Sequence, residues 1–373
     1  MSLLKFHHVK LWVANAKQAA YCYCIKFGFE PVAYRGLETG SRQVVCHVVQ
    51  QGKIVLVLES PLLPGNAEIG QFLVQHGDSV RDVAFEVEDL DSIIQKARDE
   101  GVGVVKDVWT EEDADGCVRC VTLQTYGHTV HTLIEKTNYS GSFLPGFKQP
   151  TTDTFPLASS LPDPALFCID HVVGNQSQHQ MQPVVEWYEQ MLGLHRFWSI
   201  DDETCHSDYS AMRATVVTNS QQTFLISICE PALSSRKGRS QIQEFVDFNG
   251  GAGVQHVALA TNDIINTVEA LKFRGVEFLT IPDSYYENLQ NRLAESLITV
   301  QEDIEKLRKL SILVDFDSKG YLLQIFTKPL QDRPTLFFEI IQRRNFNGFG
   351  FGNFKALFDS IELEQKKRGT LFS

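Results

Sequence analysis

The chain has 373 residues, which is long enough for two domains with separate hydrophobic cores. With 43% hydrophobic and 21% charged residues, its composition is that of a folded globular protein and excludes disordered and fibrous classes. The formal net charge of −12 argues against a nucleic-acid-binding surface, which needs clustered Lys and Arg. No apolar run reaches the roughly 20 residues that a membrane span requires, and no signal-like segment opens the sequence, so we expect a cytoplasmic protein that does not bind membranes.

In chain order, the first half predicts a strand at residues 6–9, then a helix at 16–23 that stops at Gly28. A second strand at 80–85 precedes a helix-periodic stretch that ends before Gly101. Each of these units is expected to continue into further strands. The first half therefore predicts two modules of the same kind.

A proline-rich segment at residues 144–164 then interrupts the pattern. It holds five of the 13 prolines and breaks the periodicity on both sides, as a linker does. We therefore expect an N-terminal domain at residues 1–150 and a C-terminal domain at residues 151–373.

The second half repeats the first. A strand at 169–172 and a helix at 184–188 precede Gly193, and a strand at 254–259 precedes a helix that ends before Gly275. The chain thus contains four β-α-β-type modules, two in each half, and the expected fold class is α+β.

The last part of the sequence predicts a strand at 321–326, another around 336–341, and a tail at 348–358 that is rich in Gly and Phe. A helix ending near Gly369 follows the tail. Such a tail suits an aromatic lid that excludes water from a site, but a C-terminal helix that merely docks on a sheet fits the same pattern.

Superimposing the two halves places His8 on His171, Asp82 on His256, and Thr132 on Glu339. The second half alone carries His, His and Glu at these three strand positions. They are separated by 85 and 83 residues, so adjacent strands would bring the three side chains into one cavity.

Two His and one carboxylate bind one face of an octahedral ion and leave the other positions open, which is typical of non-haem Fe(II) oxygenases. An aromatic 2-oxo acid would chelate the ion through two oxygens, and iron would supply redox chemistry with O2. The alternative is that His171 and His256 are ordinary strand histidines and Glu339 a strand-end charge. An unpaired carboxylate inside the apolar run 336–341 would cost several kcal/mol, and this cost favours the metal site.

Long segments of the chain resemble the 4-hydroxyphenylpyruvate dioxygenase family over nearly the full length. The segments that carry the resemblance are 34–42, 143–146, 170–175, 249–256, 320–329 and 331–335. The resemblance implies the vicinal-oxygen-chelate fold, with two tandem open β-barrels of paired βαβββ modules and one Fe(II) in the C-terminal barrel only. It also implies a homodimer formed through the N-terminal domains.

The family's reaction converts 4-hydroxyphenylpyruvate and O2 to homogentisate and CO2 in tyrosine and phenylalanine catabolism. The resemblance implies that His171, His256 and Glu339 are the metal ligands. The substrate pocket that it implies consists of Gln241, Gln255, Gln324, Phe326, Phe337, Phe349, Asn353 and Phe354.

Two positions depart from the family's pattern, because Ala214 stands where a serine is usual and Cys229 where an asparagine is usual. Both changes remove a hydrogen-bonding side chain from the pocket, at about 0.5–1.5 kcal/mol each. Two other functions therefore stay open: an iron enzyme that forms 4-hydroxymandelate, and a non-catalytic member of the fold that binds a ligand. Phe326 argues against the first, since mandelate-forming relatives tend to carry a smaller aliphatic residue there, and the complete triad argues against the second.

Overall fold

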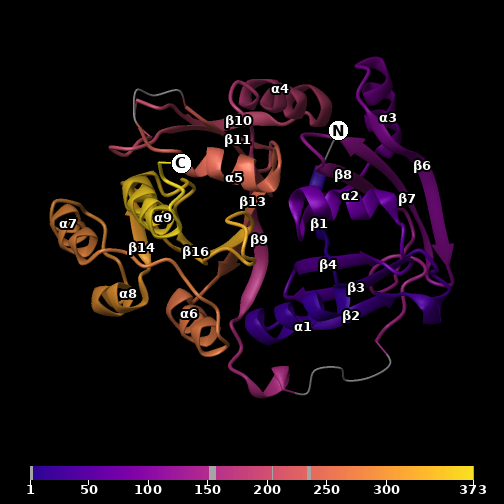
Figure 1. Ribbon diagram of the computed structural model, residues 1–373, viewed down its shortest axis with the longest axis horizontal. Coiled ribbons are helices and arrows are strands. Elements are labelled where there is room, and N and C mark those ends of the chain that lie inside the picture. Colours follow the sequence, from indigo (N-terminus) through magenta and orange to yellow (C-terminus); the bar gives the residue numbers. More distant parts are fainter. Residues whose placement is uncertain (1–2, 151–156, 204, 233–236, 373) are drawn as a thin grey trace.

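Two eight-stranded sheets with the same strand order build the chain. In the computed structural model, which describes residues 3–150, 157–203, 205–232 and 237–372, the orders are β2-β3-β4-β1-β5-β8-β7-β6 and β10-β11-β12-β9-β13-β16-β15-β14. The second order equals the first when eight is added to each strand number. The sheets lie side by side, with the first half in indigo to purple and the second in magenta to yellow (Figure 1).

The first sheet and its helices come from residues before the linker. Their bounds are β1 (Leu3–Trp12), α1 (Ala16–Phe27), β2 (Glu30–Arg35), η1 (Leu37–Thr39), β3 (Val44–Gln51), β4 (Ile54–Pro61), α2 (Ala67–His76), β5 (Ser79–Val87), α3 (Leu90–Asp99), β6 (Val104–Asp113), β7 (Gly116–Gln124) and β8 (Val130–Lys136).

The second sheet repeats this order with additional helices. Its elements are η2 (Ala158–Ser160), β9 (Leu166–Asn175), α4 (Met181–Leu192), β10 (His195–Ile200), β11 (Met212–Thr218), β12 (Leu225–Pro231), α5 (Gln241–Asn249), β13 (Gly253–Thr261), α6 (Ile264–Phe273), α7 (Asp283–Ala294), α8 (Ile304–Leu310), β14 (Leu313–Phe316), β15 (Tyr321–Phe326), β16 (Phe337–Arg344), η3 (Phe351–Asn353) and α9 (Phe354–Arg368).

Each sheet consists of two βαβββ modules joined through their first strands. β1 pairs antiparallel with β5, and β9 pairs antiparallel with β13, so the two halves of each sheet meet at these central strands. The prediction of two tandem open barrels of paired βαβββ modules is confirmed. The division at residue 150 stays a prediction, and residues 151–156 beside it lie outside the described residues.

The repeat extends to the ends of the helices. α1 ends at Gly28 with φ 74° and α4 ends at Gly193 with φ 65°, and in both helices the glycine N–H donates to a carbonyl of the last turn. A side chain at either position would be strained in this left-handed conformation, which is why a glycine marks the stop in both halves. The repeat does not predict α7 and α8, which form an insertion between α6 and β14 that has no counterpart in the first half.

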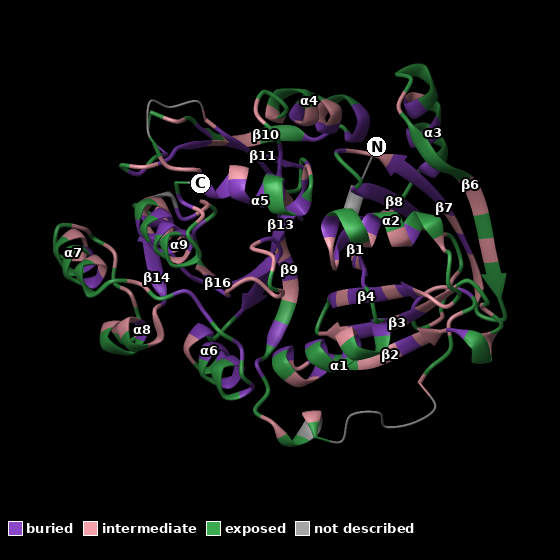
Figure 2. Cartoon of the chain, viewed as in Figure 1, coloured by how far each residue is buried: buried purple, intermediate pink, exposed green. Residues whose placement is uncertain are grey.

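Aromatic side chains pack the two halves together. The ring of Phe27 on α1 lies 5.1 Å from that of Phe338 on β16, and Phe6 on β1 lies 5.4 Å from Phe224. The strands at the centre of the molecule are mainly buried, whereas α3 and α7 present exposed faces (Figure 2). Among the helices in the described part of the chain, none has the length and apolar character needed to cross a membrane.

His131 lies in this shared core and is 1% exposed. Its Nδ1 lies 2.7 Å from the Val83 carbonyl oxygen, and its Nε2 lies 2.7 Å from the hydroxyl of Tyr188 on α4. A neutral ring satisfies both contacts, because Nδ1–H donates to the carbonyl while Nε2 accepts from the tyrosine. Burial lowers the pKa of His131 to about 4.

We expect His131 to make the protein less stable in mild acid. The unfolded chain binds a proton at this position below a pH of about 6.5, whereas the folded protein does not until a pH of about 4, so stability is lost as the pH falls between these values. Between pH 7 and pH 5, the free energy of unfolding measured in urea should therefore fall by about 2 kcal/mol less in His131→Gln than in the original protein. His195→Gln, at an exposed position, is the control and should keep the original pH dependence. Equal pH dependence in all three proteins would contradict the prediction.

Candidate metal centre and its cavity

Three adjacent strands bring His171, His256 and Glu339 together. His171 lies on β9, His256 on β13 and Glu339 on β16. Ala258 on β13 is in register with His171 on one side and with Glu339 on the other. His256 precedes Ala258 by two residues and so lies on the same face of the sheet, because side chains alternate along a strand.

The three side chains direct their donor atoms at one point. His171 Nε2 lies 3.2 Å and His256 Nε2 lies 3.4 Å from Glu339 Oε2. One donor atom from each residue lies within 4.8 Å of the others, and all three residues are buried. An ion about 2.0–2.2 Å from each donor fits such a set.

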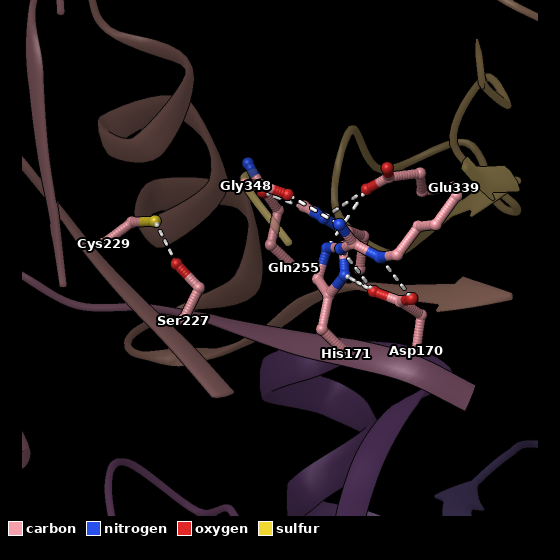
Figure 3. Close-up of polar contacts among 9 residues, drawn as sticks. Asp170, His171, Ser227, Cys229, Gln255, Glu339 and Gly348 are labelled. Carbon is pink, nitrogen blue, oxygen red and sulfur yellow. Dashed lines mark hydrogen bonds and ion pairs between the residues drawn. The ribbon is translucent and has the colours of Figure 1, made fainter. Parts of the chain in front are cut away.

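Neighbouring side chains fix the orientation of both imidazole rings. His171 Nδ1 donates to Asp170 Oδ1 at 2.8 Å, and His256 Nδ1 donates to Gln255 Oε1 at 2.9 Å (Figure 3). With Nδ1 engaged in this way, Nε2 of each ring is left to face the ion. The local sequence sets this up, since each partner immediately precedes its histidine.

Electrostatics within the cluster favour a proton where the ion would lie. Burial alone would lower the pKa of His171, but the negative charge of Glu339 and the hydrogen bond to Asp170 raise it to about 9. Burial would raise the pKa of Glu339, but the positive charge of His171 lowers it to about 2. Burial lowers the pKa of His256, which stays neutral. A metal ion binding here must therefore displace one proton.

A cavity opens beside the three donors, and the space between its walls, open solvent included, has a volume of about 630 Å³. Its lining is predominantly apolar and aromatic, with a few polar groups near the donors. The lining residues are His171, Val173, Trp198, Met212, Ala214, Ser227, Cys229, Gln241, Ile242, Gln255, His256, Gln324, Phe326, Phe337, Glu339, Phe349, Phe354, Leu357 and Phe358.

Seven of the eight residues that the resemblance assigns to the substrate pocket line this cavity. Phe337 stacks on His256 at 4.8 Å with an interplanar angle of 21°, and Phe349 lies 4.8 Å from the ring of His171. Asn353 is the exception. The turn at η3 buries its side chain, whose Oδ1 accepts a hydrogen bond of 2.6 Å from the hydroxyl of Tyr285 on α7, the inserted helix. A contact of Asn353 with substrate stays a prediction.

The two residues that depart from the family's pattern are neighbours in space. Ala214 on β11 is directly opposite Cys229 on β12, and both line the cavity. Burial raises the pKa of the Cys229 thiol to about 12, and its Sγ lies 3.7 Å from Ser227 Oγ. This corner of the cavity is therefore uncharged, with the Ser227 hydroxyl beside it.

Sequence reasoning missed Trp198 and the pair of Asp170 and Arg343. Trp198 lines the cavity from β10 and stacks on Phe349 at 6.2 Å. Arg343 lies on β16 four residues after Glu339, on the same face of the strand. An arginine on a buried strand face beside the carboxylate, together with an aspartate next to a histidine, was the signal available in the sequence.

The equivalent place in the first half is closed by its own side chains. Asp82 accepts hydrogen bonds of 2.9 and 2.5 Å from the backbone and hydroxyl of Thr132. Nearby, Glu59 accepts from Cys46 at 3.0 Å and lies 3.9 Å from the Lys10 ammonium. These acidic groups are held by partners within the first half, and among the described residues only His171, His256 and Glu339 form a convergent donor set.

Comparison with known proteins places both halves in one superfamily. Family models described as the glyoxalase/bleomycin resistance protein/dioxygenase superfamily match residues 7–120 and 169–325. A solved structure of a mutant 4-hydroxymandelate synthase from Streptomyces coelicolor has a TM-score of 0.83 and 29% identity, covering 98% of this chain and 100% of that one.

Curated relatives are similar over the whole length. The chain is 60% identical to a 4-hydroxyphenylpyruvate dioxygenase of Caenorhabditis briggsae, covering 100% of this chain and 94% of the relative. It is 57% identical to the enzyme of that name in Xenopus tropicalis, over 99% and 93% of the two chains. Against the Yarrowia lipolytica enzyme the identity is 48%, over 98% and 93%.

Proposed function

The chain belongs to the 4-hydroxyphenylpyruvate dioxygenase family and is an enzyme, and from this premise we propose that it converts 4-hydroxyphenylpyruvate and O2 to homogentisate and CO2 with one Fe(II) per chain. The observation that carries the proposal is the buried donor set of His171, His256 and Glu339 beside an aromatic cavity. We place the reaction in tyrosine and phenylalanine catabolism, in a cytoplasmic homodimer formed through residues 1–150, and this part of the proposal rests on the family alone.

The donor set suits Fe(II). Two neutral imidazoles and one carboxylate leave three positions of an octahedral ion open, which a chelating 2-oxo acid and O2 can share. When bound, the iron supplies the electron transfer to oxygen that no side chain can provide.

The chain's own residues bind and orient the substrate in this proposal. Phe326, Phe337 and Phe349 surround the space in front of the donors, and an aromatic ring packed among them would exclude water from the reacting atoms. The amides of Gln241 and Gln324 face the same space, where they provide hydrogen bonds to the polar groups of the substrate. Gln255 is engaged with His256, so we assign it to holding that ring.

The test is the product of metal-loaded protein. Metal-free protein should be inactive, and anaerobic loading with one Fe(II) per chain followed by 4-hydroxyphenylpyruvate and O2 should give homogentisate in a mass spectrum. Zn(II) binds the same donors without redox chemistry, so the zinc-loaded protein should consume no oxygen. No homogentisate from iron-loaded protein would overturn the proposal.

The same assay separates the competing product. The uncharged corner formed by Ala214 and Cys229 lacks two hydrogen-bonding side chains that the family usually has, and 4-hydroxymandelate as the main product would mean that the ring lies differently in this cavity. Homogentisate as the main product means that the remaining polar groups orient the ring sufficiently.

A further inference from the structure

Asp170 links a metal-binding histidine to an arginine on another strand. Its Oδ1 accepts from His171 Nδ1 at 2.8 Å, and its two oxygens accept from Arg343 Nε and Nη2 at 2.8 Å each. This paired contact joins β9 to the end of β16. Two parallel hydrogen bonds between a guanidinium and a carboxylate fix direction as well as distance.

Arg343 also holds the start of the aromatic tail. Its remaining terminal nitrogen, Nη1, donates to the carbonyl of Gly348 at 2.6 Å and to that of Phe346 at 3.2 Å. The guanidinium carbon lies 5.9 Å from the centre of the Phe349 ring. Every nitrogen of this side chain is therefore committed, either to Asp170 or to the tail.

The contacts close into a ring. From His171 they pass to Asp170, to Arg343 and to the tail, and Phe349 of the tail packs back on the imidazole of His171 at 4.8 Å. Only 11% of the Asp170 side chain and 20% of the Arg343 side chain are exposed, so loss of either partner leaves a largely buried charge without compensation. A change in the position of His171 must therefore be transmitted to the tail.

We propose that Asp170 and Arg343 are positioning residues that couple the orientation of His171 to the tail at residues 346–358, so that metal binding and closure of the tail over the cavity are one event. The inference rests on the metal site of the proposed function. The cavity therefore closes when the metal site is occupied, and the tail forms part of the metal centre.

Hydrogen exchange with and without Zn(II) tests the coupling without relying on turnover. In the original protein, zinc should slow amide exchange across residues 346–358 by about tenfold or more. In Arg343→Gln at saturating zinc, the same peptides should exchange as in the metal-free protein. A purely structural role for Arg343 would instead raise exchange equally with and without zinc.

The chain offers a matched control in the adjacent residue. The side chain of Arg344 is 44% exposed and lies 3.8 Å from Glu302, away from Asp170. Arg344→Gln should therefore keep the zinc-dependent protection of the tail. Arg343→Lys keeps the charge but cannot contact both Asp170 oxygens and the Gly348 carbonyl in the same geometry, so it should restore part of the protection. Unchanged exchange in residues 3–150 of all variants reports that the fold is intact.

Asp170→Asn tests the other side of the contact. The amide oxygen of the variant still accepts from His171, but its NH2 group faces the donors of Arg343. Zinc affinity should therefore fall by about 10–100-fold, the range measured for residues that support metal ligands.

The coupling would be overturned if Asp170→Asn bound zinc as tightly as the original protein, or if Arg343→Gln kept the full zinc-dependent protection. If the original protein binds no zinc or iron, the metal site itself is wrong. If it binds metal and forms homogentisate while Arg343→Gln stays protected, only the coupling is wrong.

Discussion

Replacing Glu339 with glutamine is expected to abolish turnover and to lower the affinity for Fe(II) by more than about 100-fold, since even residues that only support ligands contribute about 10–100-fold. The amide keeps the shape of the carboxylate but removes the negative charge at the point where both Nε2 atoms converge. Metal affinity is measured by titration of the metal-free protein with Fe(II) under anaerobic conditions, and turnover by oxygen uptake.

The same substitution should lower the pKa of His171, because the charge of Glu339 is what raises it above the ordinary value against the effect of burial. An NMR titration of the metal-free variant measures this shift independently of iron. The control is Glu277→Gln, at a side chain that is 73% exposed, which should bind iron and turn over as the original protein does. Substantial oxygen uptake by a folded Glu339→Gln protein would show that the carboxylate is not a ligand.

The second large effect is expected at Gly350, in the tail beside the cavity. Gly350 has φ +72°, and a Cβ added there would lie 2.4 Å from Oε1 of Gln324, which lines the cavity. In Gly350→Ala the amide of Gln324 must move, and a displacement of about 1 Å near the reacting atoms can cost about 100-fold in rate. With Fe(II) saturating, kcat/KM for 4-hydroxyphenylpyruvate should fall by up to that factor.

A matched glycine separates the backbone effect from the effect on the cavity. Gly193, at the end of α4, has φ +65° and nothing within 4 Å of an added Cβ. Gly193→Ala should lose a similar free energy of unfolding, about 1–2 kcal/mol for the left-handed backbone, while keeping the original kcat/KM. Equal kcat/KM in the two variants would show that Gln324 is not part of the substrate site.

The internal repeat made most of the fold predictable. Apolar strand segments and helices that stop at glycines such as Gly28 and Gly193 are local signals that recur in both halves, and a single proline-rich break separates the two. The same repeat put His171, His256 and Glu339 at equivalent strand positions, and the register through Ala258 explains why a spacing of about 84 residues brings them together.

Contacts between distant strands were not predictable in the same way. The pairing of Asp170 with Arg343 spans 173 residues and depends on β9 and β16 lying on either side of β13, which no local pattern encodes. Asn353 faces Tyr285 because α7 is inserted beside the tail, and the first half has no equivalent of that helix from which to infer it. Trp198 reaches the cavity from an outer strand whose alternation alone does not say which face is enclosed.

In the first half, the place that corresponds to the metal site is filled by the chain's own side chains. Asp82 is hydrogen-bonded to Thr132, and Glu59 is hydrogen-bonded to Cys46 and lies beside the Lys10 ammonium, so these buried acids have partners within the chain and need no ion. The first half packs against the second half through the rings of Phe27 and Phe338, and this contact supports the fold of the second half. A shortage of the metal that the proposed function requires should therefore leave the first half folded, as a scaffold on which activity can return when the metal does.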